Sequence, residues 1–239
     1  MGRTLRNWIC EPTRLTTATA GSLPPAQPPQ EPPPGPPEPP GSPEQIAATL
    51  AEQGWCVSDA FVPPLLVGQL RHEARERWEA GEFRRAGVGR GADRELRSEV
   101  RTDRILWLEA GALSGAQRAL WERLEGVRLA VNRRLFLGLH ELEAHFAVYP
   151  AGAYYRKHLD QFRGMGRRQL SCVLYLNHGW QPADGGALRI YTDAADTTAF
   201  VEILPLHGRL VTFLSARFLH EVLPARRERF SITGWFRTR

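Results

Sequence analysis

Three side chains in the last third of the chain have the types and spacing of a metal site. His158 and Asp160 are separated by a single residue, and His220 follows sixty residues after Asp160. Two imidazoles and one carboxylate can hold a metal ion while leaving half of its coordination sphere open, the facial arrangement associated with non-haem Fe(II). Zinc hydrolases keep a similar ligand set with one open position, so these three residues alone do not identify the metal.

An arginine nine residues beyond the second histidine bears on the choice of metal. Arg229 opens a segment in which polar and apolar residues alternate, so the side chains at every second position share one face of a strand. Polar side chains directed into a core need a polar ligand. A buried arginine opposite a metal suits a dicarboxylate that chelates the metal with its other end. This favours iron with a dicarboxylate over zinc with water. The residues on the polar face are Arg229, Ser231, Thr233 and Trp235.

The histidines and the aspartate require strands to position them. Residues i and i+2 of a strand point to the same face, so a strand over 154–159 would present His158 and Asp160 together, with Leu159 packing behind them. A later strand over 218–222, carrying His220, can lie beside the first in an antiparallel barrel.

Eight short apolar runs separated by Gly, Pro and Asp fill the chain from His145 onward. Runs of this length between turn residues predict strands, and so many of them predict a jelly roll or barrel. The predicted strands are 146–149, 154–159, 170–176, 187–191, 200–204, 209–213, 218–222 and 229–236.

Helices dominate the preceding part of the chain. Ser42 and Pro43 begin a first helix that ends before Gly54. A second helix is predicted to start at Pro63 and Pro64 and to end near Gly81, and a third to span 114–137. Strands are predicted at 55–57 and 104–108. The fold class is therefore α+β, mainly β, with a helical support at 43–137 and a catalytic β core at 138–239. We expect Trp78, Trp107 and Trp121 to lie in the core between helices and barrel.

Two segments lack the pattern of either element. Residues 24–43 hold twelve prolines, so residues 1–42 are predicted to be a disordered tail, more a spacer than a proline-motif ligand. Residues 84–98 are glycine-rich and charged, without the glycine spacing of a nucleotide-binding loop. A long loop of this kind inside a domain is often a lid over an active site.

Composition limits the setting of the protein. The net charge is +5, but Glu and Asp are interspersed among the arginines, which disfavours a nucleic-acid partner. Three cysteines, no membrane-length apolar run and no apolar signal segment predict a monomeric cytoplasmic protein without membrane attachment. Histidines outside the triad are expected to be surface or structural residues: His72, His140, His145, His178 and His207.

Several separated motifs resemble the prolyl-hydroxylase-domain branch of the Fe(II)- and 2-oxoglutarate-dependent dioxygenases, especially its small bacterial members. The resemblance covers roughly residues 43–238. The matching motifs are Val-Tyr-Pro at 148–150, His-Leu-Asp at 158–160, Leu-Tyr-Leu-Asn at 174–177, Asp-Gly-Gly-Ala-Leu-Arg-Ile at 184–190, His-Glu-Val-Leu-Pro-Ala at 220–225, Arg-Phe-Ser-Ile-Thr-Gly-Trp at 229–235 and Val-Arg-Thr-Asp-Arg-Ile-Leu-Trp at 100–107.

The resemblance implies a double-stranded β-helix (jelly-roll) core and a role for each motif residue. It assigns Fe(II) to His158, Asp160 and His220, and the distal carboxylate of 2-oxoglutarate to Arg229. It further implies that Tyr175 and Thr233 hydrogen-bond the co-substrate, and that Tyr149 and Trp235 line the pocket near the metal.

Near the predicted entrance the resemblance is less complete. Arg167 or Arg168 falls where the family places a basic residue. Gln161 and Phe162 replace the Asn-Pro that animal members carry after the metal motif, which leaves the substrate open.

The implied reaction consumes 2-oxoglutarate and O2, releases succinate and CO2, and hydroxylates a prolyl residue of a protein substrate. L-Ascorbate is a further candidate cofactor, and bacterial relatives point to a translation factor as the target. Two alternatives stay open at this point. The first is a related oxygenase acting on another peptide residue, a free amino acid or a nucleic-acid base, and the second is a non-catalytic metal-binding module.

Overall fold

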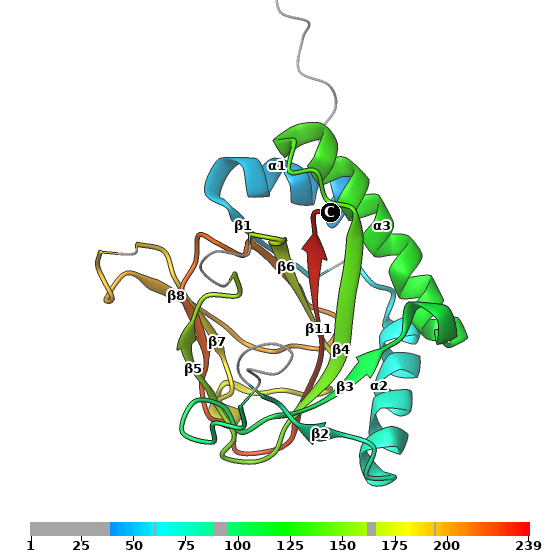
Figure 1. Cartoon of the computed structure of the whole chain (residues 1–239). Helices are drawn as coiled ribbons and strands as arrows, with labels where there is room; N and C mark the ends of the chain where they lie inside the picture. Colours follow the sequence, from blue (N-terminus) through cyan, green and yellow to red (C-terminus); the bar gives the residue numbers. More distant parts are fainter. Residues whose placement is uncertain (1–38, 60, 88–94, 162–165, 194) are drawn as a thin grey trace, which may run out of the picture. The chain divides into compact units, whose positions relative to one another are not determined.

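Two antiparallel sheets and three α-helices make up the described part of the chain (Figure 1). A computed structural model describes residues 39–59, 61–87, 95–161, 166–193 and 195–239. The predicted tail at 1–42 therefore lies outside the described residues except for its last four positions. Residues 88–94 of the predicted lid and Phe162 lie outside them as well.

Local capping signals define the first helix. Helix α1 (Pro43–Gln53) begins at Ser42, whose side chain accepts a hydrogen bond from the backbone N–H of Gln45. It ends at Gly54, which adopts the left-handed conformation at φ 85°. These boundaries confirm the prediction.

The other helices start and end close to the predicted positions. They are α2 (Pro64–Glu79) and α3 (Gly115–Leu135). Short 3₁₀ turns lie before α3 at η2 (Ala110–Ala112) and later in the chain at η3 (Pro182–Asp184). None of the helices in the described ranges is long and apolar enough to cross a membrane.

Seven strands form the major sheet and four form the minor sheet. In spatial order the major sheet consists of β1 (Trp55–Ser58), β9 (Leu210–Leu214), β6 (Arg168–Tyr175), β11 (Arg229–Arg237), β4 (Glu141–Tyr149), β3 (Arg104–Leu108) and β2 (Arg84–Arg85). The minor sheet consists of β5 (Tyr155–His158), β10 (His220–Val222), β7 (Leu188–Tyr191) and β8 (Phe200–Ile203).

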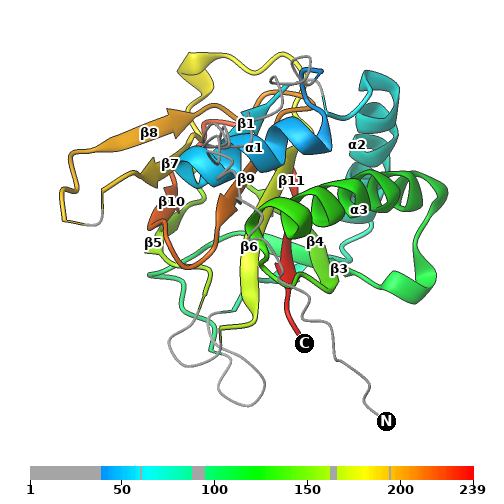
Figure 2. The ribbon, with the colours of Figure 1, turned by 90° about the horizontal axis from the view of Figure 1, so that it is seen from above.

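The period of two in the strands divides the apolar residues into two cores. On β4, Phe146 and Val148 pack with the helices, whereas Ala147 and Tyr149 pack with residues of the minor sheet. Figure 2 shows α1 and α3 side by side over one face of the major sheet. Its central strands are thus buried on both faces, which explains their nearly continuous apolar runs.

All eight strands predicted after residue 145 are present, and the architecture is the expected jelly-roll type. One upstream prediction was wrong: the segment 84–98 was taken to have no regular structure. Arg84 and Arg85 form strand β2, which pairs with Ile105 and Arg104. Two residues are too short a run for any periodicity, and only the neighbouring β3 makes them a strand.

Candidate active site

The two histidines and the aspartate meet where β5 and β10 pair. His158 ends β5 and lies directly opposite His220, the first residue of β10. Asp160 lies between the rings, with its two carboxylate oxygens each 3.5 Å from one Nε2 atom. One potential ligand atom from each residue falls within 4.8 Å of the others. Within the described ranges no other cluster of three or more His, Cys, Asp or Glu side chains has this geometry.

Backbone carbonyls set the orientation of both imidazoles. His158 Nδ1 is 2.7 Å from the carbonyl oxygen of Arg156, and His220 Nδ1 is 3.1 Å from that of Phe218. Because a carbonyl only accepts, each Nδ1 must carry the proton and donate it. The Nε2 lone pairs then face Asp160, as metal ligation requires.

The charge states of His220 and Asp160 also suit a cation. Burial, assisted by nearby His158, lowers the pKa of His220 to about 4, so its ring is neutral at pH 7. Burial opposes ionisation of Asp160, but His220, His158 and the 2.7 Å hydrogen bond from Ser171 Oγ together hold its pKa well below its usual range. A neutral imidazole and an ionised carboxylate are the donors that a divalent metal needs.

The conformation that presents Asp160 differs from the predicted one. Strand β5 ends at His158, and Asp160 lies in a bend beyond it rather than on the same strand. Leu159 does not pack behind the pair: it is 36% exposed and lines the cavity. Once the chain leaves the ladder, alternation no longer decides which way a side chain points.

Arg229 lies on β11 with only 1% of its surface exposed. Its Nε donates to the carbonyl oxygen of Gly186 at 2.9 Å, and its guanidinium lies 4.9 Å and 4.8 Å from the ring centroids of Tyr149 and Tyr175. No carboxylate of the described residues pairs with it. A buried cation without a protein counter-ion is costly, so this position fits an acidic ligand.

Tyr175 adds a donor beside the guanidinium. Its hydroxyl is buried and has no hydrogen-bond partner among the described residues. Burial raises the pKa of Tyr175, with Arg229 opposing, so the hydroxyl keeps its proton. A buried O–H without a partner next to Arg229 fits a second contact to the same carboxylate.

Gly186 allows this close approach. It has a φ of 68°, and an added Cβ would lie 2.8 Å from Ala225 Cβ and 3.2 Å from Arg229 Cδ. Only glycine combines that backbone conformation with so little space. A glycine in the Gly-Gly pair of the sequence motif therefore allows the Gly186 carbonyl oxygen to accept the hydrogen bond from Arg229.

One cavity of about 310 Å³ connects these features. All eight predicted site residues line it: Tyr149, His158, Asp160, Tyr175, His220, Arg229, Thr233 and Trp235. The structure therefore brings all eight together in one cavity.

Two aromatic residues of the cavity wall were not among the predicted site residues. Trp107, predicted in the core, is 43% exposed and lines the cavity, and His145, predicted as surface or structural, is buried in the same wall. Their rings lie 4.8 Å apart, and that of Trp235 is 5.4 Å from His145. Trp107 is the cross-strand partner of His145, which in turn faces Thr233.

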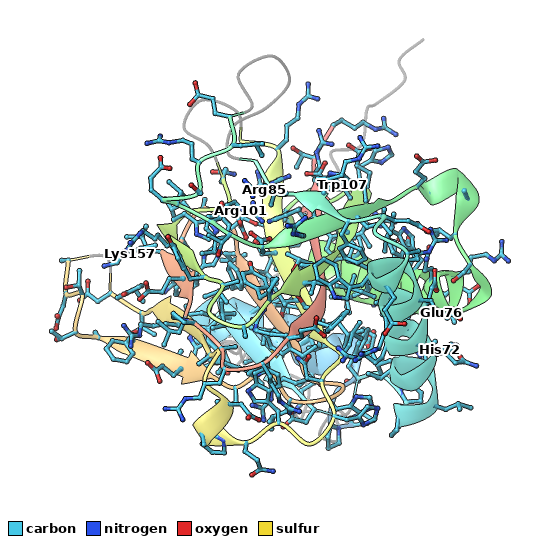
Figure 3. The ribbon with its side chains drawn as sticks, turned by 90° about the horizontal axis from the view of Figure 1, so that it is seen from below. His72, Glu76, Arg85, Arg101, Trp107 and Lys157 are labelled. Atoms are coloured by element: carbon cyan, nitrogen blue, oxygen red, sulfur yellow. The ribbon has the colours of Figure 1, made fainter. Side chains whose placement is uncertain are left out.

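A period-2 signal for Trp107 was present in the sequence. On β3, Leu106 and Leu108 pack toward the helices while Ile105 and Trp107 line the cavity. The bulk of the tryptophan side chain suggested a core position, but the alternation decided its face. Figure 3 shows Trp107 on the same side of the molecule as Arg85 and Arg101.

Of the two arginines proposed near the entrance, Arg168 lines the cavity. Its guanidinium stacks 3.6 Å from the ring centroid of Trp235, and its Nε donates to Glu143 Oε1 at 2.7 Å. The guanidinium is thus held flat against the aromatic wall.

A second group of contacts supports His158 from the opposite side, and the sequence analysis did not identify it. Tyr155 stacks on His158 with ring centroids 3.5 Å apart. Arg101 covers Tyr155 at 4.1 Å and is held by a bidentate pair with buried Asp103, at 2.8 Å and 2.6 Å. These residues lie far apart in sequence, so only the tertiary fold reveals the stack.

A family profile and curated relatives both match this chain to 2-oxoglutarate-dependent oxygenases. The profile of the 2OG-Fe(II) oxygenase superfamily matches residues 144–237. Egl nine homolog 1 of Homo sapiens is 31% identical over 203 residues, which represent 81% of this chain and 46% of the human protein. The chain thus spans less than half the length of that relative.

Solved structures extend the match over the described fold. A crystal structure of a Pseudomonas putida prolyl-4-hydroxylase is 43% identical, with a TM-score of 0.73, and the match covers 82% of this chain and 99% of that one. A prolyl hydroxylase from Trichoplax adhaerens, solved with a peptide of hypoxia-inducible factor, is 25% identical with a TM-score of 0.71, covering 82% and 90% of the two chains.

Proposed function

This chain belongs to the 2OG-Fe(II) oxygenase superfamily, and on that premise we propose that it is a dioxygenase that hydroxylates a prolyl residue of a protein substrate. The observation that carries the proposal is a single cavity containing both the His158, Asp160 and His220 cluster and the buried Arg229. We assign Fe(II) to the cluster, 2-oxoglutarate to Arg229, and catalysis to a domain spanning residues 43–239.

The positions of the cavity residues support a separate role for each of them in the reaction. Bound Fe(II) with O2 supplies the oxidising chemistry, coupled to decarboxylation of 2-oxoglutarate to succinate and CO2. Arg229 and the Tyr175 hydroxyl would hold the distal carboxylate of 2-oxoglutarate. Thr233 adds a hydroxyl on the same strand. Tyr149 and Trp235 line the cavity and would exclude water from it.

The aromatic wall supports a prolyl residue as the group that is hydroxylated. Trp107, His145 and Trp235 line the cavity together, and Arg168 stacks on the Trp235 ring beside them. Proline-containing peptides dock on aromatic-lined surfaces because the rigid pyrrolidine ring loses little entropy there. An exposed Trp107 at the mouth suits a macromolecular substrate that remains partly in solvent.

We propose a cellular setting that suits this chemistry. Cys56 and Cys172 are buried free thiols, as in a reducing compartment such as the cytoplasm. We take the enzyme to act there as a monomer, with L-ascorbate keeping the iron ferrous. A bacterial translation factor is the protein substrate we would test first.

Mass spectrometry of cellular proteins tests the proposal. The full chain, supplied with Fe(II), 2-oxoglutarate and L-ascorbate, should convert 2-oxoglutarate to succinate and add 16 Da to a proline-containing peptide of a protein from an enzyme-deficient lysate. The 16 Da shift on a residue other than proline, or on a free amino acid or a nucleobase, would replace the prolyl assignment. Absence of succinate formation with all components present would remove the oxygenase assignment itself.

Gly186→Ala tests the support of Arg229. The new Cβ has a disfavoured φ and crowds Arg229 Cδ and Ala225, so the guanidinium should shift. Misplacing one charge-assisted hydrogen bond loses about 1.5 kcal/mol, so we expect the KM for 2-oxoglutarate to rise by about 10-fold. Succinate formation measured against 2-oxoglutarate concentration checks this. Gly81→Ala, at a φ of 75° with open space around it, is the matched control for backbone strain.

A further inference from the structure

Two residues that directly adjoin the metal histidines face away from the cavity. Lys157 precedes His158 on β5, and Glu221 follows His220 on β10. Successive strand residues point to opposite faces, so these two side chains lie on the outer face of the minor sheet. Neither lines the cavity, and Lys157 is exposed. Figure 3 shows Lys157 on the side of the molecule away from α2, which carries His72 and Glu76.

Both side chains contact the same residue of the next strand. Lys157 Nζ lies 3.9 Å from the ring centroid of Tyr191, and the hydroxyl of Tyr191 donates to Glu221 Oε1 at 2.6 Å. Tyr191 ends β7, which pairs with β10 on the side opposite β5. One phenol thus links β5 and β10 behind the two histidines. We propose that Tyr191 is a positioning residue for the metal centre, acting through Lys157 and Glu221.

The pairing between β5 and β10 explains why such a link is needed. His220 faces His158, but the next registered pair is Val222 with Tyr155, so the ladder shifts register directly beside the metal ligands. Such irregularities are common next to active sites and leave residues without ladder bonds. The strands contain only four and three residues, so few backbone bonds hold them together.

The bonds that orient the imidazoles do not set the distance between the strands. Each Nδ1 bonds a carbonyl two residues earlier on its own side of the pair, Arg156 for His158 and Phe218 for His220. These two bonds therefore fix each ring relative to its own segment. The contacts of Tyr191 with Lys157 and Glu221 fix one segment relative to the other.

The contacts are strong enough for this role. A phenol donating to a carboxylate at 2.6 Å is a short, charge-assisted bond, and Tyr191 is only 6% exposed. Glu221 also accepts from Arg189 Nη1 at 3.1 Å, so its carboxylate is held from two directions. An ammonium over an aromatic face adds a second attraction on the β5 side.

The test uses Co(II), a stable stand-in for Fe(II), as the probe of the full chain without 2-oxoglutarate. Partners outside the ligand shell typically change metal affinity by about 10–100-fold. We expect Tyr191→Phe, which removes only the hydroxyl, to raise the Kd for Co(II) by about 10-fold and to alter its visible d–d spectrum. Lys157→Met should act in the same direction, and Lys157→Arg, which can still stack on the ring, should restore the wild-type values.

Glu79→Gln is the matched control. It removes the charge from a 2.7 Å ion pair with Arg75 on α2, away from Lys157, Tyr191 and Glu221, so the Co(II) Kd should not change. The melting temperature of each apo variant separates stability from positioning. An unchanged Kd and spectrum in Tyr191→Phe, even with a lower melting temperature, would overturn the proposal. If Tyr191→Phe does not fold, exposed Lys157→Met decides, and an unchanged Kd there has the same meaning.

This inference rests on the assignment of His158, Asp160 and His220 as metal ligands, and the same titration separates the two failures. Wild-type Co(II) affinity in Asp160→Ala would overturn the ligand assignment itself. Lost affinity in Asp160→Ala combined with wild-type affinity in Tyr191→Phe would leave the metal site standing and reject only the role of Tyr191.

Discussion

Replacing Asp160 by alanine should abolish both metal binding and succinate formation. Asp160 is the only carboxylate among the three candidate ligands, and it lies between the two Nε2 atoms. Without it, the cation keeps only the two imidazoles as ligands. Removal of an outer-shell partner already changes affinity by about 10–100-fold, so loss of the anionic ligand should raise the Co(II) Kd by at least about 100-fold. Titration with Co(II), and succinate formation with Fe(II), measure the two effects.

Two further variants separate the charge of Asp160 from its shape and from general damage. Asp160→Asn keeps the size of the side chain but removes the negative charge. Its Co(II) Kd and its rate of succinate formation should therefore resemble those of Asp160→Ala rather than those of wild type. Glu44→Ala removes an exposed carboxylate that pairs with Arg133 at 2.9 Å, and it should retain full activity. Succinate formation at the wild-type rate in Asp160→Ala would show that the metal lies elsewhere.

The parts of the fold that follow from local rules could be predicted from the sequence. Ser42 before a proline and Gly54 after an apolar run mark the ends of α1, because caps depend on residues within a few positions. The alternation on β11 was equally informative. Arg229, Thr233 and Trp235 all line the cavity because a period of two survives the whole strand.

Positions that the sequence did not predict are those where tertiary contacts override the local pattern. Leu159 faces the cavity because the chain leaves β5 at His158, and no local signal marks that bend. His145 and Trp107 become wall residues only because β3 and β4 pair in one particular register. The pairing of strands nearly 40 residues apart depends on the whole fold, so it cannot be predicted from the types of single residues.

The residues that stack behind His158 could not be predicted from the sequence either. Arg101, Asp103 and Tyr155 look like ordinary charged and aromatic residues in the sequence, more than 50 positions apart from end to end. The pairing of the segments around Arg101 and Tyr155 brings them together, through an isolated bridge between these two residues and the backbone hydrogen bonds on either side of it. Residue types that bind metals are recognisable without a structure, whereas residues that support those ligands are not.

Replacing Arg229 by alanine should have its main effect on the co-substrate. The guanidinium is buried, has no protein carboxylate among the described residues, and lies beside the free hydroxyl of Tyr175. Hydrogen bonds to charged groups contribute about 1.5–3 kcal/mol each, so losing a bidentate contact of about 3 kcal/mol should raise the KM for 2-oxoglutarate by about 100-fold. Affinity for Co(II) without 2-oxoglutarate should stay near the wild-type value, because Arg229 contacts none of the candidate ligands.

A co-substrate without the distal carboxylate shows whether this explanation is right. Wild type should strongly prefer 2-oxoglutarate over 2-oxopentanoate, which has the same chain length but ends in a methyl group. In Arg229→Ala that preference should largely disappear, because residue and carboxylate form one coupled pair. Arg133→Ala, which removes an exposed arginine paired with Glu44, should keep the wild-type preference. If Arg229→Ala discriminates between the two acids as wild type does, the distal carboxylate binds elsewhere and Arg229 has another role.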